Sequence, residues 1–327
     1  MEKKPSIVQK FYSDEFKIAR KGKWYAIAPA VIILVGLIIV LVINFNLGLD
    51  FTGGRIITIR NLDNTNWNQY RNDVTAILND SDVNRFTITR IGEGDIVDLS
   101  IEFQHVRGFS DEQMNELTTE LLATLNTQFP GANVVNDGET SARASGEHLL
   151  RTFMAVMAAL IGILIYMLFR FKFSSGVSAL VGLFHDILVM LALTAIFRIQ
   201  INAAYIAALI TVIAYSLNNT LILFDRVRSI EKHNNNLLTI EEVVDKSIKE
   251  TFVRTMNTTI TTLVPIFVLV IFGVPLIREF AIPILFGLIA GTFSTIFVTT
   301  SLYVRFEKSK LAARKRKRQQ ANIKTSA

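Results

Sequence analysis

The sequence contains no cysteine among its 327 residues, which excludes disulfide-stabilised folds, thiolate metal sites and cysteine nucleophiles. Charged residues are scarce, at 19% of the chain against about 25% in an average soluble protein. The four histidines, at positions 105, 148, 185 and 233, are too far apart in the sequence to indicate a metal site. No glycine-rich phosphate loop precedes a helix, and no nucleophile stands beside a base. We therefore expect no enzyme activity, no cofactor and no metal.

Long apolar stretches with few charged residues account for this composition. Half of the residues are hydrophobic, and the mean hydropathy is +0.39. Six apolar stretches of at least 21 residues each cover residues 25–45, 149–169, 176–196, 201–224, 257–277 and 280–304. About 20 residues of helix cross a hydrocarbon core of about 30 Å. A large soluble helical core is the alternative, but six such stretches favour an α-helical polytopic membrane protein with six transmembrane helices.

Basic and acidic residues occupy different parts of the chain. Residues 48–147 contain 7 Arg, no Lys and 16 Asp or Glu, a net charge of −9. Lys and Arg gather at both ends of the chain and beside the apolar stretches. This pattern sets the orientation of membrane proteins and is not typical of nucleic-acid-binding proteins. The pattern predicts basic cytoplasmic tails at 1–24 and 305–327, a first span at 25–47, an extracytoplasmic domain at 48–147 and a bundle at 148–304. The C-terminal tail is a solvated flank or, alternatively, a contact for anionic membrane lipid or ribosomal RNA.

The acidic segment 48–147 has the patterning of an independent domain. Strand-like runs at 55–60, 85–91, 96–103 and 133–135 and helical runs at 66–78 and 110–128 follow one another in the order β-α-β-β-α-β. This order is typical of a ferredoxin-like α+β domain, and we interpret it as a binding or docking module.

Two capping boxes mark helix starts. The first, at Ser110–Gln113, begins the second helix of the acidic segment. The second, at Thr239–Glu242, begins an amphipathic helix over about 239–252, which we place at the cytoplasmic membrane face.

The third apolar stretch contains Asp186 beside His185. A charged Asp at the centre of a bilayer helix costs about 2.5–3.5 kcal/mol on insertion scales, and protonation reduces that cost. Asp186 is therefore either a proton carrier or one half of a packing pair that hydrogen-bonds neighbouring helices.

Further polar groups lie on the fourth stretch and at the start of the fifth span. The fourth stretch includes Tyr215, Asn218 and Asn219, and the fifth span opens with Arg254, followed by Thr258. Adjacent amides inside hydrocarbon must face a helix interface or a wet cavity, since lipid offers no hydrogen-bond partner. Arg254 either extends to the membrane surface or acts as a fixed positive charge within the bundle.

Four motifs carry a resemblance to a known family. Residues 48–54 read GLDFTGG directly after the first span, residues 214–220 read AYSLNNT, residues 224–228 read FDRVR and residues 254–258 read RTMNT. These segments resemble the GLDFTGG, GYSxNDT, FDRIRE and SRTxNT motifs of SecF, a subunit of the bacterial protein-export complex SecDF within the RND superfamily. The layout of one span, an outer domain and five spans is also similar, so the resemblance covers essentially the whole chain.

The resemblance implies a bacterial plasma-membrane protein that forms a heterodimer with SecD. It also implies contact with the SecYEG channel and with translocating unfolded polypeptide, and the use of a proton or sodium gradient to complete export. It assigns an ion relay to Asn219 and Arg254, to which the polar residues of the spans add Asp186, Asn218, Tyr215 and Thr258 as candidates. It further assigns a junction between span and head to Asp50, Gly53 and Gly54, and a cytoplasmic-edge motif to Asp225, Arg226 and Arg228.

Two positions depart from the family pattern. Asn219 stands where the motif has Asp, and Ala214 stands where it has Gly. Because Asn does not titrate, three interpretations remain: an engineered substitution, a natural variant in which Asp186 or a partner's carboxylate carries the ion, or an uncoupled homologue. The alternative functions are an RND-type exporter half for lipid or another small molecule, and a scaffold that only stabilises a partner complex.

Overall fold

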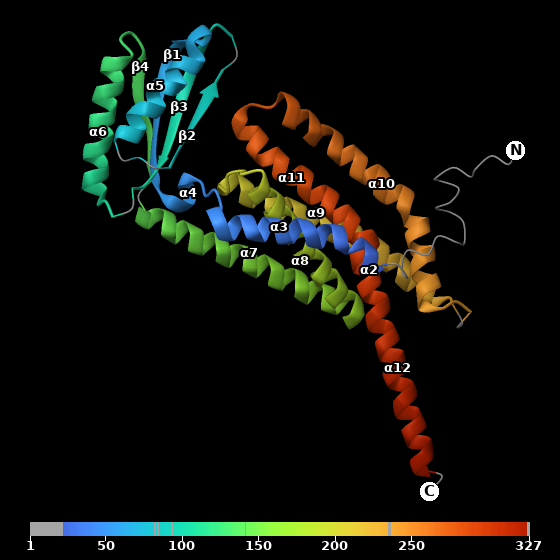
Figure 1. Cartoon of the computed structure of the whole chain (residues 1–327). Coiled ribbons are helices and arrows are strands. Elements are labelled where there is room, and N and C mark those ends of the chain that lie inside the picture. Colours follow the sequence, from blue (N-terminus) through green and yellow to red (C-terminus); the bar gives the residue numbers. More distant parts are fainter. Residues whose placement is uncertain are drawn as a thin grey trace, which may run out of the picture.

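The computed structural model describes residues 22–325 except 82, 84, 93, 107, 141, 235 and 236. Most of the expected N-terminal tail, residues 1–21, lies outside the described residues. A small domain with a β-sheet, residues 54–140, which we call the head domain, stands at one end of a bundle of long helices (Figure 1).

The head domain is built on a four-stranded antiparallel sheet. Its elements are, in chain order, β1 (Gly54–Asp63), the short helix η1 (Asn64–Asn66), α5 (Trp67–Asp80), β2 (Phe86–Ile91), β3 (Ile96–Gln104), α6 (Asp111–Gln128) and β4 (Asn133–Thr140). The strands lie in the order β2-β3-β1-β4, so β1 and β3 form the centre of the sheet.

Alternating apolar residues on the central strands explain the core of the head domain. Ile57 and Ile59 of β1 and Leu99 and Ile101 of β3 are fully buried. They pack with buried residues of α5 and α6 in one cluster. The capping box predicted at Ser110 is present and begins α6.

The bundle contains α2 (Gly22–Tyr25), α3 (Ile27–Ile43), α7 (Ala142–Arg170), α8 (Phe173–Ile196), α9 (Ala203–Lys232), α10 (Ile240–Phe272), α11 (Pro275–Phe293), the π-helical segment η2 (Ser294–Thr299) and α12 (Thr300–Thr325). Within the described residues, five helical segments are long and apolar enough to cross a membrane: Ser145–Arg170, Phe173–Ile196, Ala203–Lys232, Ile240–Phe272 and Ile277–Arg314. The apolar helix α3 has 17 residues.

Several boundaries differ from those expected. Helix α3 ends at Ile43, short of the expected 25–47, because Asn44 turns the chain with a φ of 57°. Helix α10 runs without a break from its Thr239 capping box into the fifth apolar stretch, so the expected amphipathic helix is its first part. Helix α7 starts at Ala142, inside the segment assigned to the outer domain.

The last helical segment extends beyond the bundle. Helices α11 and α12 continue into one another through η2, and α12 projects away from the other helices (Figure 1). The basic segment 305–327, expected as a tail, is therefore helical as far as Thr325.

Helix α8 is the centre of the bundle and contacts α3, α9, α11 and η2. Glycines allow the close approach at two of the helix crossings. A methyl group at Gly36 of α3 would overlap Ala192 of α8, and one at Gly287 of α11 would overlap Val212 of α9. Small residues of this kind are typical of helix interfaces in membranes.

Candidate functional site

Asp186 is fully buried where α8, α9 and α11 meet. Its Oδ1 lies 3.0 Å from Nδ1 of His185, and its Oδ2 accepts a hydrogen bond from the Ser216 hydroxyl of α9 at 2.5 Å. Gly291 of α11 lies against this pair, because a methyl group there would be 3.3 Å from the Ser216 hydroxyl oxygen and 3.5 Å from Asp186 Oδ2. Three helices therefore enclose one carboxyl group and its hydrogen-bond donor.

Asn219 lies one helical turn after Ser216 and is also fully buried. Neither its side-chain oxygen nor its side-chain nitrogen has a hydrogen-bond partner among the described residues. The neighbouring Thr220 lies 3.1 Å, hydroxyl to hydroxyl, from Thr295 of η2. Asp186 and Asn219 are thus both in the interior of the bundle, on facing helices.

The remaining relay candidates are exposed or only half-buried. Asn218 and Arg254 are exposed, and Thr258 donates to the backbone carbonyl of Arg254 at 2.9 Å. Tyr215 donates its hydroxyl to Thr259 of α10 at 2.8 Å. Arg254 has no ion pair within the described part of the chain and lines an open cleft of about 580 Å³. The structure therefore does not bring Arg254 to Asp186.

The junction motif connects the head domain to the start of α9. Asp50 lies in the short helix α4 (Leu49–Thr52), and its Oδ2 accepts a hydrogen bond from the backbone amide of Ala203 at 2.8 Å. Beside it, the chain pairs with the segment before α9 through two backbone bonds of 2.8 Å, Gly48 N–H to Ile201 O and Ile201 N–H to Asn46 O. Asp50 therefore binds the N-terminus of the helix that carries Ser216 and Asn219.

Gly53 and Gly54 turn the chain from α4 into β1 with φ values of 71° and 147°. These values lie in the region that favours glycine. A methyl group at Gly54 would also overlap the carbonyl oxygen of Phe103 on β3. Both glycines are therefore required for the sheet to begin directly at the junction.

Residues 225–228, the expected cytoplasmic-edge motif, join three helices. Arg170, at the end of α7, donates to Asp225 of α9 at 3.2 Å, and Arg228 donates to the Arg170 carbonyl at 3.3 Å. Arg226 pairs with Glu250 of α10. These exposed pairs link the C-terminal parts of α7 and α9 to each other and to α10, and each contributes little stability.

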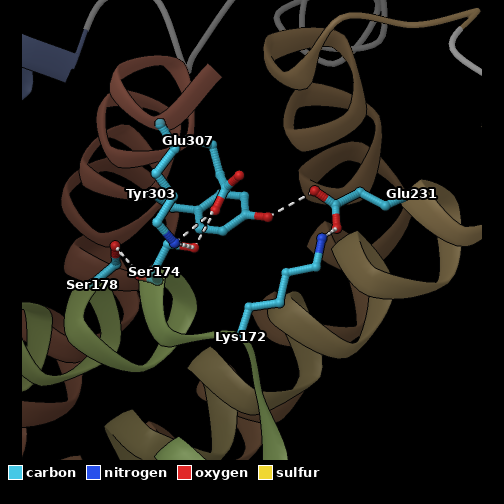
Figure 2. A network of polar contacts seen from close by, with 7 residues as sticks. Lys172, Ser174, Ser178, Glu231, Tyr303 and Glu307 are labelled. Carbon is cyan, nitrogen blue, oxygen red and sulfur yellow. Dashed lines mark hydrogen bonds and ion pairs between the residues drawn. The ribbon is translucent and has the colours of Figure 1, made fainter. Parts of the chain in front are cut away.

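A second polar cluster at the same end of the bundle was not predicted from the sequence. Lys172 donates to Glu231 at 2.5 Å, and the buried Tyr303 donates to the other oxygen of Glu231 at 2.7 Å (Figure 2). Ser174 of α8 donates to Glu307 of α12. Glu231 and Glu307 keep side-chain exposures of 17% each, so both carboxylates are at the edge of solvent.

Sequence reasoning also missed the link from Asp50 to Ala203 and the role of Ser216. Residues 50 and 203 are 153 positions apart, and spacing along the chain carries no signal for such a contact. The signal for Ser216 was present, because Ser216 and Asn219 are separated by three residues and share one helix face.

A head domain with an antiparallel sheet, joined to a bundle of long apolar helices with buried polar groups at its centre, defines a multi-pass membrane protein. The family model "Protein export membrane protein SecD/SecF, C-terminal" matches residues 121–309, and the "SecD/SecF GG Motif" model matches residues 41–60. The chain belongs to the SecD/SecF family of protein-export membrane proteins.

Curated relatives match most of the chain. The protein translocase subunit SecF of Petrotoga mobilis is 30% identical over 298 residues, which are 90% of this chain and 97% of the relative. SecF of Rickettsia akari is 31% identical over 280 residues, 85% of this chain and 87% of the relative. SecF of Helicobacter pylori is 29% identical over 281 residues, 85% and 83% respectively.

Two solved structures share the fold. The crystal structure of SecDF, a translocon-associated membrane protein from Thermus thermophilus, superposes with a TM-score of 0.75 at 25% identity over 93% of this chain. A SecDF structure in the super-membrane-facing form gives 0.65 at 26% identity over the same share. This chain spans 40% of the length of either SecDF chain.

Proposed function

We propose that this chain is a SecF subunit of the Sec protein-export machinery. It pairs with a SecD-type subunit beside the SecYEG channel and uses a proton or sodium gradient to complete the translocation and release of exported polypeptides. The names of the curated relatives and the family model support the export role. The chain accounts for 40% of the matched SecDF chain, which supports a SecD-type subunit as the remainder.

The proposed topology places the head domain outside the bacterial plasma membrane and both termini in the cytoplasm. It counts α3 as the first of six spans, with a length of about 25 Å at about 1.5 Å per residue. The strand order β2-β3-β1-β4, with α5 and α6 as the two connecting helices, supports a ferredoxin-like fold for the head domain.

The contact of Asp50 with Ala203 carries the proposed coupling. It joins the base of the head domain to Ala203, the first residue of α9. On the same helix, the Ser216 hydroxyl donates a hydrogen bond to Asp186 in the membrane interior. A change in the protonation of Asp186 alters its bond to Ser216 and shifts α9, and α9 moves the head domain through Asp50. One rigid helix thus connects an ion-dependent site with the domain that handles the exported chain.

The available energy suits a switch between two head positions. One elementary charge that crosses 100 mV releases about 2.3 kcal/mol. At about 1.4 kcal/mol per factor of ten, this shifts a two-state equilibrium about fifty-fold. Such a bias is enough to rectify the movement of an unfolded chain.

The exposed polar residues of α9 and α10 form the proposed contact with the SecD-type subunit. Asn218 and Arg254 are exposed on apolar helices, and lipid offers such groups no hydrogen-bond partner. A second helical bundle covers them and supplies partners, which include a carboxylate for Arg254.

The test is an export assay in proteoliposomes that contain SecYEG and the complex of this chain with its SecD-type subunit. We expect the complex to stimulate release of exported protein into the lumen, and we expect ionophores that dissipate the membrane potential and ion gradients to remove the stimulation. Vesicles that carry Asp186→Asn serve as the control and should resemble ionophore-treated vesicles. Stimulation that persists with ionophores present contradicts the ion coupling.

A further inference from the structure

Two facing rows of small and polar residues run along the bundle interior from Asp186 towards the end that carries Glu307. On α8, every fourth residue belongs to one row: Ser174, Ser178, Gly182 and Asp186. On the last helical segment, every fourth residue belongs to the other: Gly291, Thr295, Thr299, Tyr303 and Glu307. Residues four apart share one face of a helix, so each row is a continuous strip.

The two rows are in contact at three levels. Gly291 lies against Asp186, a methyl group at Gly182 would overlap the Thr299 hydroxyl, and Ser174 donates to Glu307. Apart from Glu307, the polar residues of both rows are buried. Apolar side chains would fill the same space between the helices without the cost of burying polar groups. Helix α9 completes the enclosure with Ser216, Asn219 and Thr220.

Asn219, beside these rows, and Thr299, within one of them, lack hydrogen-bond partners among the described residues. The amide of Asn219 and the hydroxyl of Thr299 are fully buried, and no described residue hydrogen-bonds to them. The adjacent Thr300 is equally buried, but it donates to the Ile296 carbonyl at 2.5 Å. Burial of an unsatisfied polar group costs about 1–3 kcal/mol, and internal water is what satisfies such groups in proteins. Internal water would supply the partners that Asn219 and Thr299 lack among the described residues.

The spacing of the rows suits a chain of hydroxyls and water. Side chains one helical turn apart are separated by about 5–6 Å, which one water bridges with two hydrogen bonds of about 2.8 Å. The π-helical segment η2 ends at Thr299, and such segments break the regular hydrogen bonding of a helix, frequently at functional sites.

The row ends at carboxylates that reach solvent. The Tyr303 hydroxyl, one turn after Thr299, donates to Glu231, and Lys172 binds the other oxygen of Glu231 (Figure 2). Glu307 lies one turn further along α12 and binds Ser174 and Lys310. Carboxylates at the edge of solvent collect and release protons readily.

We propose that Asp186 exchanges its proton with the Glu231–Glu307 end of the bundle through a file of water and hydroxyl groups lined by Asn219, Thr295, Thr299 and Tyr303. The proposal rests on the proposed ion-coupled function and gives this subunit a proton path of its own. Each oxygen in the file accepts one proton and releases another, so only the Asp186 carboxylate and the terminal carboxylate change protonation. Few charges surround the Asp186 carboxyl group, because His185 is the one described titratable group in contact with it. The facing parts of α3, α9, α11 and η2 contain no Asp, Glu, Lys, Arg or His.

The test compares two adjacent buried threonines in the complete complex in lipid. Infrared difference spectroscopy after a rapid pH jump follows the carbonyl band of the protonated Asp186 carboxyl, which is identified by its loss in Asp186→Asn. We expect Thr299→Val to slow the change of this band by about tenfold or more, equivalent to at least about 1.4 kcal/mol in the barrier. Thr300→Val removes a hydroxyl that is already satisfied and should match the wild type. Thr299→Ser, which keeps the hydroxyl, should restore the rate.

Three results would overturn the proposal: equal rates for Thr299→Val and wild type, equal slowing by Thr300→Val, or no Asp186 band at any pH. If Thr299→Val fails to assemble, Asn219→Leu tests the same file. Unchanged pH-jump rates together with gradient-dependent export would reject this path and leave the proposed function intact. Slowed exchange together with export that ignores ionophores would support the path and reject the ion coupling of export.

Discussion

The carboxylate of Asp50 accepts a hydrogen bond from the backbone amide of Ala203 at 2.8 Å, across 153 residues of sequence. Ala203 is the first residue of α9, and the first amides of a helix lack intrahelical partners and carry a partial positive charge. The bond thus fixes the base of the head domain to one end of a 30-residue helix whose middle contacts Asp186.

Replacement of Asp50 tests whether this bond transmits movement. Asp50→Ala should cost about 0.5–2 kcal/mol of stability, as for loss of a helix cap, and should reduce gradient-dependent export more than this destabilisation explains. Asp50→Asn keeps an acceptor without the charge and should be intermediate. Thermal unfolding and proteoliposome export measure the two effects.

Asp63→Ala is the matched control for Asp50. Asp63 caps the short helix η1 inside the head domain through Thr65 and has no described contact with the bundle. It should lower stability slightly and leave export unchanged. Equal export from Asp50→Ala and Asp63→Ala would show that the junction bond has no part in coupling.

Ser216→Ala removes the donor to Asp186 without a change in charge. The Oδ2 atom of Asp186 then stays buried without this partner, which should cost about 1–3 kcal/mol of unfolding free energy. Ser247→Ala is the control, because Ser247 is also buried but donates only to the Val243 carbonyl of its own helix. Thermal unfolding in detergent should separate the two variants, and equal melting temperatures would argue against a strong Ser216–Asp186 bond.

Local patterns in the sequence predicted local structure well. The alternation of apolar residues located the strands, and the boxes at Ser110 and Thr239 mark the first residues of α6 and α10. Long apolar stretches located the long apolar helices because burial in lipid leaves little choice of side chain. Each of these signals lies within about 20 residues of sequence.

The arrangement of the site depended on contacts that sequence does not encode locally. Arg254 and Asn219 both belong to motifs of the same family resemblance, yet one is exposed and the other fully buried, because α9 and α10 present different faces to the bundle centre. The rotation of each helix about its axis follows from glycines such as Gly182 and Gly291, whose significance appears only beside Thr299 and Ser216. A one-dimensional pattern does not pair such positions.

Helix packing at glycine predicts a contrast between two Gly→Ala substitutions. A methyl group at Gly287 would overlap Val212 of α9, so Gly287→Ala should destabilise the bundle by about 1–3 kcal/mol through overpacking. Gly162 of α7 has no atom within 4 Å of the same position, and Gly162→Ala should stabilise by up to about 1 kcal/mol through helix propensity. If Gly287→Ala and Gly162→Ala shifted the melting temperature in the same direction, the close packing of α11 against α9 at Gly287 would be contradicted.

The head domain should show a local response to acid at Asp63. Hydrogen bonds from the Thr65 amide and hydroxyl lower the pKa of Asp63 from its ordinary value of 3.8. A lowered folded-state pKa stabilises the fold above the unfolded pKa, and this contribution is lost as pH falls through the folded value. Amide exchange protection at Thr65 should therefore decline below about pH 4. Asp63→Asn should remove the decline, and Thr65→Val, which keeps the backbone donor, should reduce it.

The absence of native cysteine makes the proposed SecD-facing surface directly testable. A single cysteine introduced by Asn218→Cys should cross-link to the SecD-type subunit, because Asn218 and Arg254 are the exposed polar residues of α9 and α10 that the proposed second bundle covers. Ile161→Cys is the control, since Ile161 is an exposed apolar residue on α7 and suits contact with lipid. Gel analysis after mild oxidation, with cysteines placed along the partner's helices, should give a dimer band for position 218 only. A band for position 161 alone would place the SecD-type subunit against α7 and reject the surface at Asn218 and Arg254 as the interface.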